Sequence, residues 1–194
     1  MKKLIFGVVG IMVLITLGCS TTNTVPLTQT PEPSDTHPIN EMALLWFERG
    51  NAYVQSGNYE DAVKDSTQAI ATDSNYADAY YSRGHVLGRL GKHEQAINDF
   101  TQALLLNPKN ANAYADRGVA HGILGQHALA ISDFTQAITL NPNFAGGYYN
   151  RAIGYFAEKK CSEARKDVRQ AQDLGYQKIQ PEFLDNLKRD CPEN

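Results

Sequence analysis

The chain has 194 residues, of which 42% are hydrophobic and 20% are charged, so it is long enough to bury about one core. Its net charge is -3 and it has no dense basic run, which disfavours a nucleic-acid partner. Its three cysteines are too few and too scattered for a structural zinc module or a disulfide-rich miniprotein.

The N-terminal segment has the organisation of a secretory signal. Lys2 and Lys3 form a charged start, and an uncharged, mostly apolar stretch follows from Leu4 to Gly18. That stretch is too short for a comfortable membrane span. Residues 1–18 are therefore predicted to be a signal peptide.

The sequence ITLGC at residues 15–19 resembles the lipobox of bacterial lipoproteins, with Thr16 where the family usually has Leu. The resemblance implies that Cys19 is acylated, for instance with palmitate, and starts the mature chain. Several acyl chains anchor stably because each buried methylene contributes about 0.8 kcal/mol. Ser20 then implies sorting to the periplasmic face of the outer membrane. Two alternatives stay open: an uncleaved signal anchor, and ordinary cleavage that leaves Cys19 an unmodified thiol.

The next segment has the composition of a disordered tether. It is rich in Thr and Pro, carries few charges, and shows neither helical nor strand periodicity. Such a segment cannot bury enough apolar surface to order itself. Residues 19–41 are therefore predicted to be the lipidated cysteine and a flexible tether.

Residues 42–178 contain four copies of one 34-residue unit, at 43–76, 77–110, 111–144 and 145–178. Positions are numbered here from 1 to 34 within each copy. Position 4 is aromatic in every copy, positions 20 and 27 are Ala, and position 8 is Gly in the first three. Asn-Pro pairs at positions 31 and 32 end the second helix of the two central copies.

This pattern resembles the tetratricopeptide repeat (TPR) family. The resemblance implies an all-α, right-handed superhelical solenoid of four helix pairs with a concave groove. Departures from the family pattern lie in the outer copies, where terminal repeats are expected to be atypical. They are Ser66, Ser74, Ala152, Lys159, Val168 and Tyr176. Within residues 179–194, Pro181 to Arg189 are predicted to form an amphipathic capping helix, with Phe183, Leu184 and Leu187 on one face.

Position 7 is Arg and position 23 is Asp in every copy. If each hairpin turns near position 15, these positions face each other across the two helices, which predicts four structural ion pairs rather than a functional site. The pairs are Arg49 with Asp65, Arg83 with Asp99, Arg117 with Asp133, and Arg151 with Asp167.

Two cysteines are candidates for a disulfide in an oxidising periplasm. Cys161 begins the second helix of the fourth repeat, and Cys191 follows the antiparallel capping helix, so the two are expected to be neighbours. The alternative is a pair of unpaired thiols.

No catalytic, metal or cofactor motif emerges from the sequence. His93 and His127 share one repeat position, and His85 and His121 have no ligand partner at metal-binding spacing. The glycine series that begins at Gly84 recurs in the next repeat and is explained by helix packing. The sequence therefore predicts a protein that is not an enzyme and needs no cofactor or metal.

The TPR resemblance implies that first-helix positions 2, 5, 9, 12 and 13 line most of the groove. The predicted groove residues are Phe47, Asn51, Tyr81, His85, Arg89, Val119, Ile123, Tyr149, Ile153 and Phe156. They are mostly apolar, and of the carboxylate-clamp pattern only Asn51 and Arg89 fit, so a clamp is rejected.

An apolar groove suits an amphipathic helix or an extended segment, so we expect a protein or peptide partner, in an envelope adaptor or in pilus or secretin assembly. The predicted centre comprises Tyr81, His85, Tyr149, Ile153 and Phe156. Four alternatives stay open: packing of these residues against the next repeat or a folded-back tail, a small-molecule ligand, catalysis, and a homodimer formed through the groove.

Overall fold

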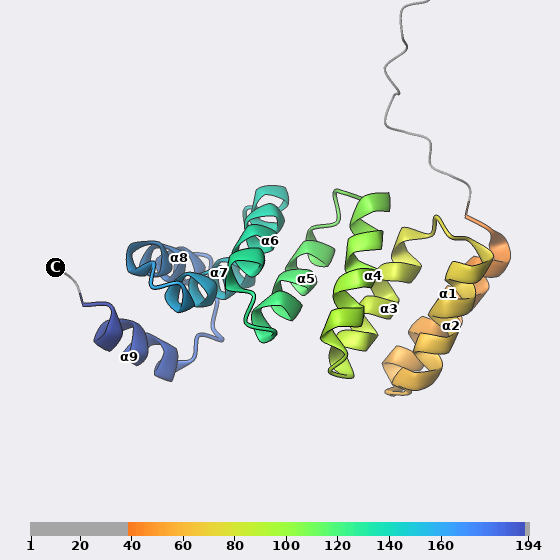
Figure 1. Ribbon diagram of the computed structural model, residues 1–194, viewed down its shortest axis with the longest axis horizontal. Helices are drawn as coiled ribbons and strands as arrows, with labels where there is room; N and C mark the ends of the chain where they lie inside the picture. Colours follow the sequence, from red (N-terminus) through yellow and green to blue (C-terminus); the bar gives the residue numbers. More distant parts are fainter. Residues whose placement is uncertain (1–38, 193–194) are drawn as a thin grey trace, which may run out of the picture. The chain divides into compact units, whose positions relative to one another are not determined.

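A computed structural model describes residues 39–192, which form nine α-helices and no strand (Figure 1). The signal peptide, Cys19, Ser20 and most of the tether lie outside the described residues. The helices are α1 (Glu41–Ser56), α2 (Tyr59–Thr72), α3 (Ala77–Arg89), α4 (His93–Leu106), α5 (Ala111–Ile123), α6 (His127–Leu140), α7 (Ala145–Ala157), α8 (Cys161–Asp173) and α9 (Pro181–Asp190). None of these helices is both long and apolar enough to cross a bilayer.

Short turns join the two helices of each repeat at position 15. Gly57, Gly91 and Gly125 adopt positive φ angles of 79°, 75° and 73° there, a conformation that glycine reaches without strain. The fourth repeat has Lys159 at the same place, with a φ of 59°. The backbone path of the turn is therefore kept although the side chain differs.

Helix pairs contact one another in chain order, through α2 with α3, α4 with α5, and α6 with α7 (Figure 1). The alanines at positions 20 and 27 are buried in every repeat. A Cβ atom on Gly84 would lie 3.0 Å from the ring of Phe100, and one on Gly118 would lie 3.0 Å from Phe134. Small residues therefore set how closely the helices of a pair approach.

Each position-7 arginine bonds to the position-23 aspartate of its own repeat, the pairing that the hairpin register predicts. In the third repeat, Arg117 donates from Nε and Nη2 to the two carboxylate oxygens of Asp133, at 2.9 and 2.7 Å. The other three pairs have the same two-bond arrangement. The carboxylate hydrogen bonds raise the pKa of all four arginines, so the guanidinium groups stay charged.

Three of these arginines also connect neighbouring repeats. Arg117 Nη1 donates to Oγ1 of Thr101 in the preceding repeat at 3.1 Å. Arg83 and Arg151 make the equivalent bond to Thr67 and Thr135. One side chain therefore links both helices of its own pair to the pair before it.

The C-terminal helix α9 covers the last repeat, and a disulfide joins Cys161 to Cys191. Phe183 and Leu187 of α9 are buried in a cluster with Ala164 and Val168 of α8. The cap is therefore held by apolar packing and by one covalent bond.

Candidate functional site

Three hollows lie along the first helices of the repeats. The first, about 330 Å³, is lined by Phe47, Asn51, Val54, Asp78, Tyr81, Ser82 and His85. The middle one, about 210 Å³, is lined by His85, Gly88, Arg89, His93, Phe100, Asp116, Val119, Ala120 and Ile123. The third, about 280 Å³, is lined by Gly118, Val119, Gly122, Ile123, His127, Ala130, Phe134, Asn150, Ile153 and Gly154.

These hollows form one groove because neighbouring hollows share residues. His85 lines the first and the middle hollow, while Val119 and Ile123 line the middle and the third. Val119, Ile123 and Ile153 are 41%, 59% and 40% exposed, high values for aliphatic side chains on consecutive repeats. The groove therefore presents apolar surface to whatever enters it.

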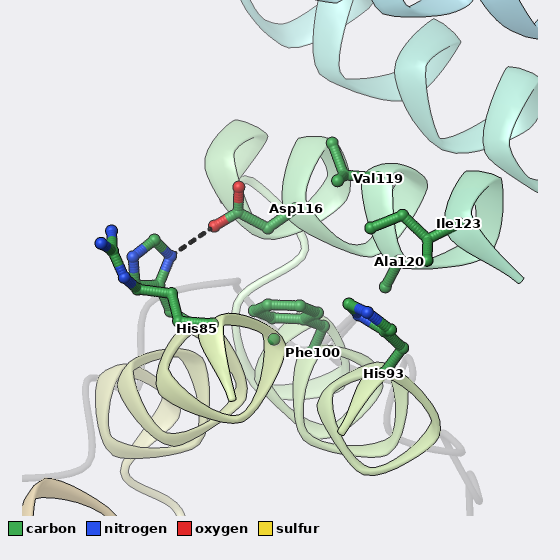
Figure 2. A pocket seen from close by; sticks show the side chains of 9 residues that line it. His85, His93, Phe100, Asp116, Val119, Ala120 and Ile123 are labelled. Carbon is green, nitrogen blue, oxygen red and sulfur yellow. Dashed lines mark hydrogen bonds and ion pairs between the residues drawn. The ribbon is translucent and has the colours of Figure 1, made fainter. Parts of the chain in front are cut away.

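A polar contact in the groove joins the second repeat to the third. Figure 2 shows His85 on α3 facing Asp116 on α5, with the His85 Nδ1 atom 3.1 Å from Oδ2 of the carboxylate. The hydroxyl of Tyr81 donates to the same oxygen at 3.1 Å. Burial, with a smaller effect of the Asp116 charge, raises the pKa of Tyr81. Tyr81 therefore remains a neutral hydrogen-bond donor, and the three side chains tie α3 to α5.

Three other predicted residues lie along the N-terminal half of the groove. Phe47 packs against Tyr76, with ring centroids 5.0 Å apart. Asn51 accepts a hydrogen bond from the Ser82 hydroxyl at 3.1 Å. Arg89 is exposed, and its guanidinium lies 5.3 Å from the centroid of the Tyr59 ring.

Tyr149, which the sequence placed at the centre of the groove, is buried, so that part of the prediction is wrong, whereas Phe156 is half-buried. Tyr149 is only 5% exposed, and its ring lies edge-on to Phe183 at a centroid distance of 5.6 Å. Phe156 makes the same edge contact with Phe183, also at 5.6 Å. The backbone N–H of Gln180 donates to the Tyr149 hydroxyl. The chain's own cap therefore occupies the place that a partner was expected to take.

Sequence reasoning also missed several lining residues. Asp78, Ser82, His93, Asp116 and Asn150 line hollows but were absent from the predicted set. Ser82, Asp116 and Asn150 all stand at position 6 of their repeats. Position 6 lies three or four residues from positions 2 and 9, so it shares their face of the helix. This spacing could have predicted that position 6 lines the groove. The contact of His85 with a carboxylate was also missed, because Asp116 lies in the next repeat.

The described residues define an all-α helical-repeat protein with a groove along the first helix of each repeat. A TPR repeat model matches residues 50–91, and a tetratricopeptide repeat model matches 77–110 and 111–144. A structure of the second TPR of Spaghetti (RPAP3) bound to HSP90 peptide SRMEEVD is 34% identical, with a TM-score of 0.52, covering 52% of this chain and 94% of that chain. The chain belongs to the tetratricopeptide repeat family.

Longer matches come from structures of MamA. One crystal structure is 25% identical, with a TM-score of 0.67, and the match covers 71% of this chain and 80% of that chain. MamA from Desulfovibrio magneticus RS-1 is 21% identical, with a TM-score of 0.72, covering 78% and 88%. The second likeness shows the fold alone. No curated protein sequence matches the chain.

Proposed function

We propose that this protein is a non-enzymatic scaffold that binds an apolar segment of a partner protein in its groove. The observation that carries the proposal is the continuity of the three hollows, which share His85, Val119 and Ile123 and expose aliphatic side chains along their length. Pockets in a row hold a peptide through side chains that act as anchors. The TPR structure of Spaghetti (RPAP3) bound to a peptide supports this kind of partner.

Arg89 favours an acidic residue in the partner segment at the middle hollow, because the acidic residue of that lining, Asp116, already accepts a hydrogen bond from Tyr81 and lies 3.1 Å from His85 Nδ1. Arg89 lines the middle hollow, is exposed, and forms no ion pair with any residue in the described part of the chain. By contrast, the four position-7 arginines are all bonded to aspartates. An exposed cation beside an apolar hollow complements a carboxylate that accompanies an apolar anchor.

The proposed setting is the bacterial envelope. Lipid on Cys19 and a Thr- and Pro-rich tether would hold the repeats at the periplasmic face of the outer membrane. There the groove would act in the assembly of an envelope complex, as an adaptor for cell-wall enzymes or as a pilus or secretin assembly factor.

Photocrosslinking in living cells tests the groove. A photoreactive amino acid in place of Ile123 should give one partner adduct, whereas the same probe in place of Gln102, an exposed residue of α4, should give none. An adduct between two copies of the chain would support the homodimer instead. Equal adducts from both positions, or no adduct from either, would contradict the proposal.

Anchoring has a separate test. Replacing Cys19 by Ala should abolish incorporation of labelled palmitate and move the chain from the membrane fraction to the soluble fraction, because the acyl chains supply the membrane affinity. A matched Cys191→Ala variant should still be labelled. If the Cys19→Ala chain stays in the membrane fraction, an uncleaved signal anchor holds it.

A further inference from the structure

Two glycines that line the groove are required neither by a positive φ angle nor by close helix packing. Gly88 and Gly122 lie inside helices without positive φ, unlike the turn residue Gly91. A Cβ atom on Gly88 would meet nothing closer than 4.0 Å, and one on Gly122 nothing closer than 3.9 Å, whereas a Cβ on Gly84 would crowd Phe100. Helix packing and backbone conformation therefore both permit a larger residue where the chain has glycine.

Glycine at these two positions leaves space inside the groove. Gly88 lines the middle hollow and Gly122 lines the third. The first repeat has Val54 at this position, and the fourth has Phe156, whose ring contacts Phe183 of the cap. Glycine weakens a helix relative to any residue except proline, so these two positions lower the stability of the helices. A function for the space that glycine leaves would offset that cost. We infer that the space receives side chains from a partner.

First helices of neighbouring repeats contact each other, α3 with α5 and α5 with α7. Helices in contact lie about 8 to 10 Å apart, so we expect two hollows one repeat apart to have about this separation. In an α-helix, residues i and i+7 share a face and are separated by about 10.5 Å. In an extended strand, residues on one face are about 6.6 or 13 Å apart, which fits less well. Two anchors on a helix can therefore enter both hollows together.

The lining of each hollow restricts the type of anchor. Val119 and Ile123 line both hollows, and Figure 2 shows the Phe100 ring among the side chains of the middle one, so large aliphatic side chains suit both. Arg89 places an unpaired cation at the middle hollow, where the carboxylate of Asp116 is already in contact with Tyr81 and His85. The third hollow has no Asp, Glu, Lys or Arg in its lining. The partner should therefore be acidic near one anchor and uncharged near the other.

We propose that Gly88 and Gly122 form the bases of two anchor pockets for an amphipathic helix. That helix carries large aliphatic residues seven positions apart and an acidic residue within one turn of the anchor that enters the middle hollow. This inference rests on the proposed function, because it names the chemistry of the partner bound in the same groove.

Phage display tests the proposal. A random library of 16-residue peptides is selected for binding to the purified full chain. Selected peptides should share two aliphatic residues seven positions apart and a nearby Asp or Glu. Gly88→Leu and Gly122→Leu should each weaken the binding of a selected peptide at least ten-fold, while Gly88→Ala should weaken it less than three-fold. Gln102→Leu on α4 is the matched control and should leave the affinity unchanged.

Arg89→Gln should weaken the same peptide three- to ten-fold, and the difference should shrink in high salt. Thermal unfolding of the glycine variants should show stability equal to or above that of the parent chain, which separates loss of binding from loss of folding.

Two results would contradict the anchor pockets and leave the proposed function standing. In the first, peptides crosslink to position 123 but lack the seven-residue spacing. In the second, they bind the Gly88→Leu and Gly122→Leu variants as tightly as the parent chain. If no selected peptide binds the groove, both the anchor pockets and the proposed function are contradicted.

Discussion

Replacing Arg117 by Met should lower the free energy of unfolding by about 3 kcal/mol, because it leaves the Asp133 carboxylate with only His121 Nε2, at 3.9 Å, beside it. Asp133 is only 5% exposed, so water cannot replace the two hydrogen bonds from the guanidinium. The same change also removes the bond to Thr101 in the preceding repeat. Chemical denaturation of the purified full chain, followed by circular dichroism, measures the loss.

Arg49 provides the matched control. Its side chain is 54% exposed, against 19% for Arg117, and no described repeat precedes it to supply a threonine. Arg49→Met should therefore destabilise less than Arg117→Met. A second comparison removes both charges: Arg117→Met combined with Asp133→Leu should recover most of the stability, since no buried charge is left unpaired. Because Asp65 is as buried as Asp133, at 4% against 5% exposed, equal losses in the two single variants would contradict a role for burial of the guanidinium and for the bond to Thr101.

The ion pairs within each repeat could be predicted from the sequence, because the repeat fixes which positions of its two helices face each other. Arg at position 7 and Asp at position 23 face each other once the turn is placed near position 15, and the turn is marked by Gly91 and Gly125. The bonds between repeats were not predicted. Whether Arg117 reaches Thr101 depends on how one helix pair is placed on the next, and no spacing within a repeat encodes that placement.

The groove was predicted only in part, for a related physical reason. Family positions identified Val119, Ile123 and Ile153, which lie at positions 9 and 13 and stay exposed, Ile153 even in the fourth repeat. Tyr149 and Phe156 lie at positions 5 and 12 of the fourth repeat. That repeat is followed by α9, and Phe183 contacts both rings. The pattern identified a capping helix correctly yet did not show which groove residues that helix would cover.

Reducing the Cys161–Cys191 disulfide should lower the stability of the C-terminal end by about 3 to 4 kcal/mol. The bond closes a loop with a sequence separation of 30 residues, and the loss follows from the extra freedom that the unfolded chain then gains. Because repeat arrays unfold in parts, we expect the loss to be concentrated in α8 and α9. Hydrogen exchange with and without dithiothreitol measures it helix by helix.

Release of α9 should also change the groove itself. Phe183 and Leu187 are buried against the fourth repeat, so their departure would expose Tyr149 and Phe156 and increase the binding of an apolar dye. A chain with Cys161→Ala and Cys191→Ala should behave like the reduced protein and should not respond to dithiothreitol. Unchanged exchange in α9 after reduction would mean that apolar packing alone holds the cap. In that case Tyr149 stays covered in every redox state, and binding is confined to the three hollows between α1 and α7, the third of which includes Ile153 of the fourth repeat.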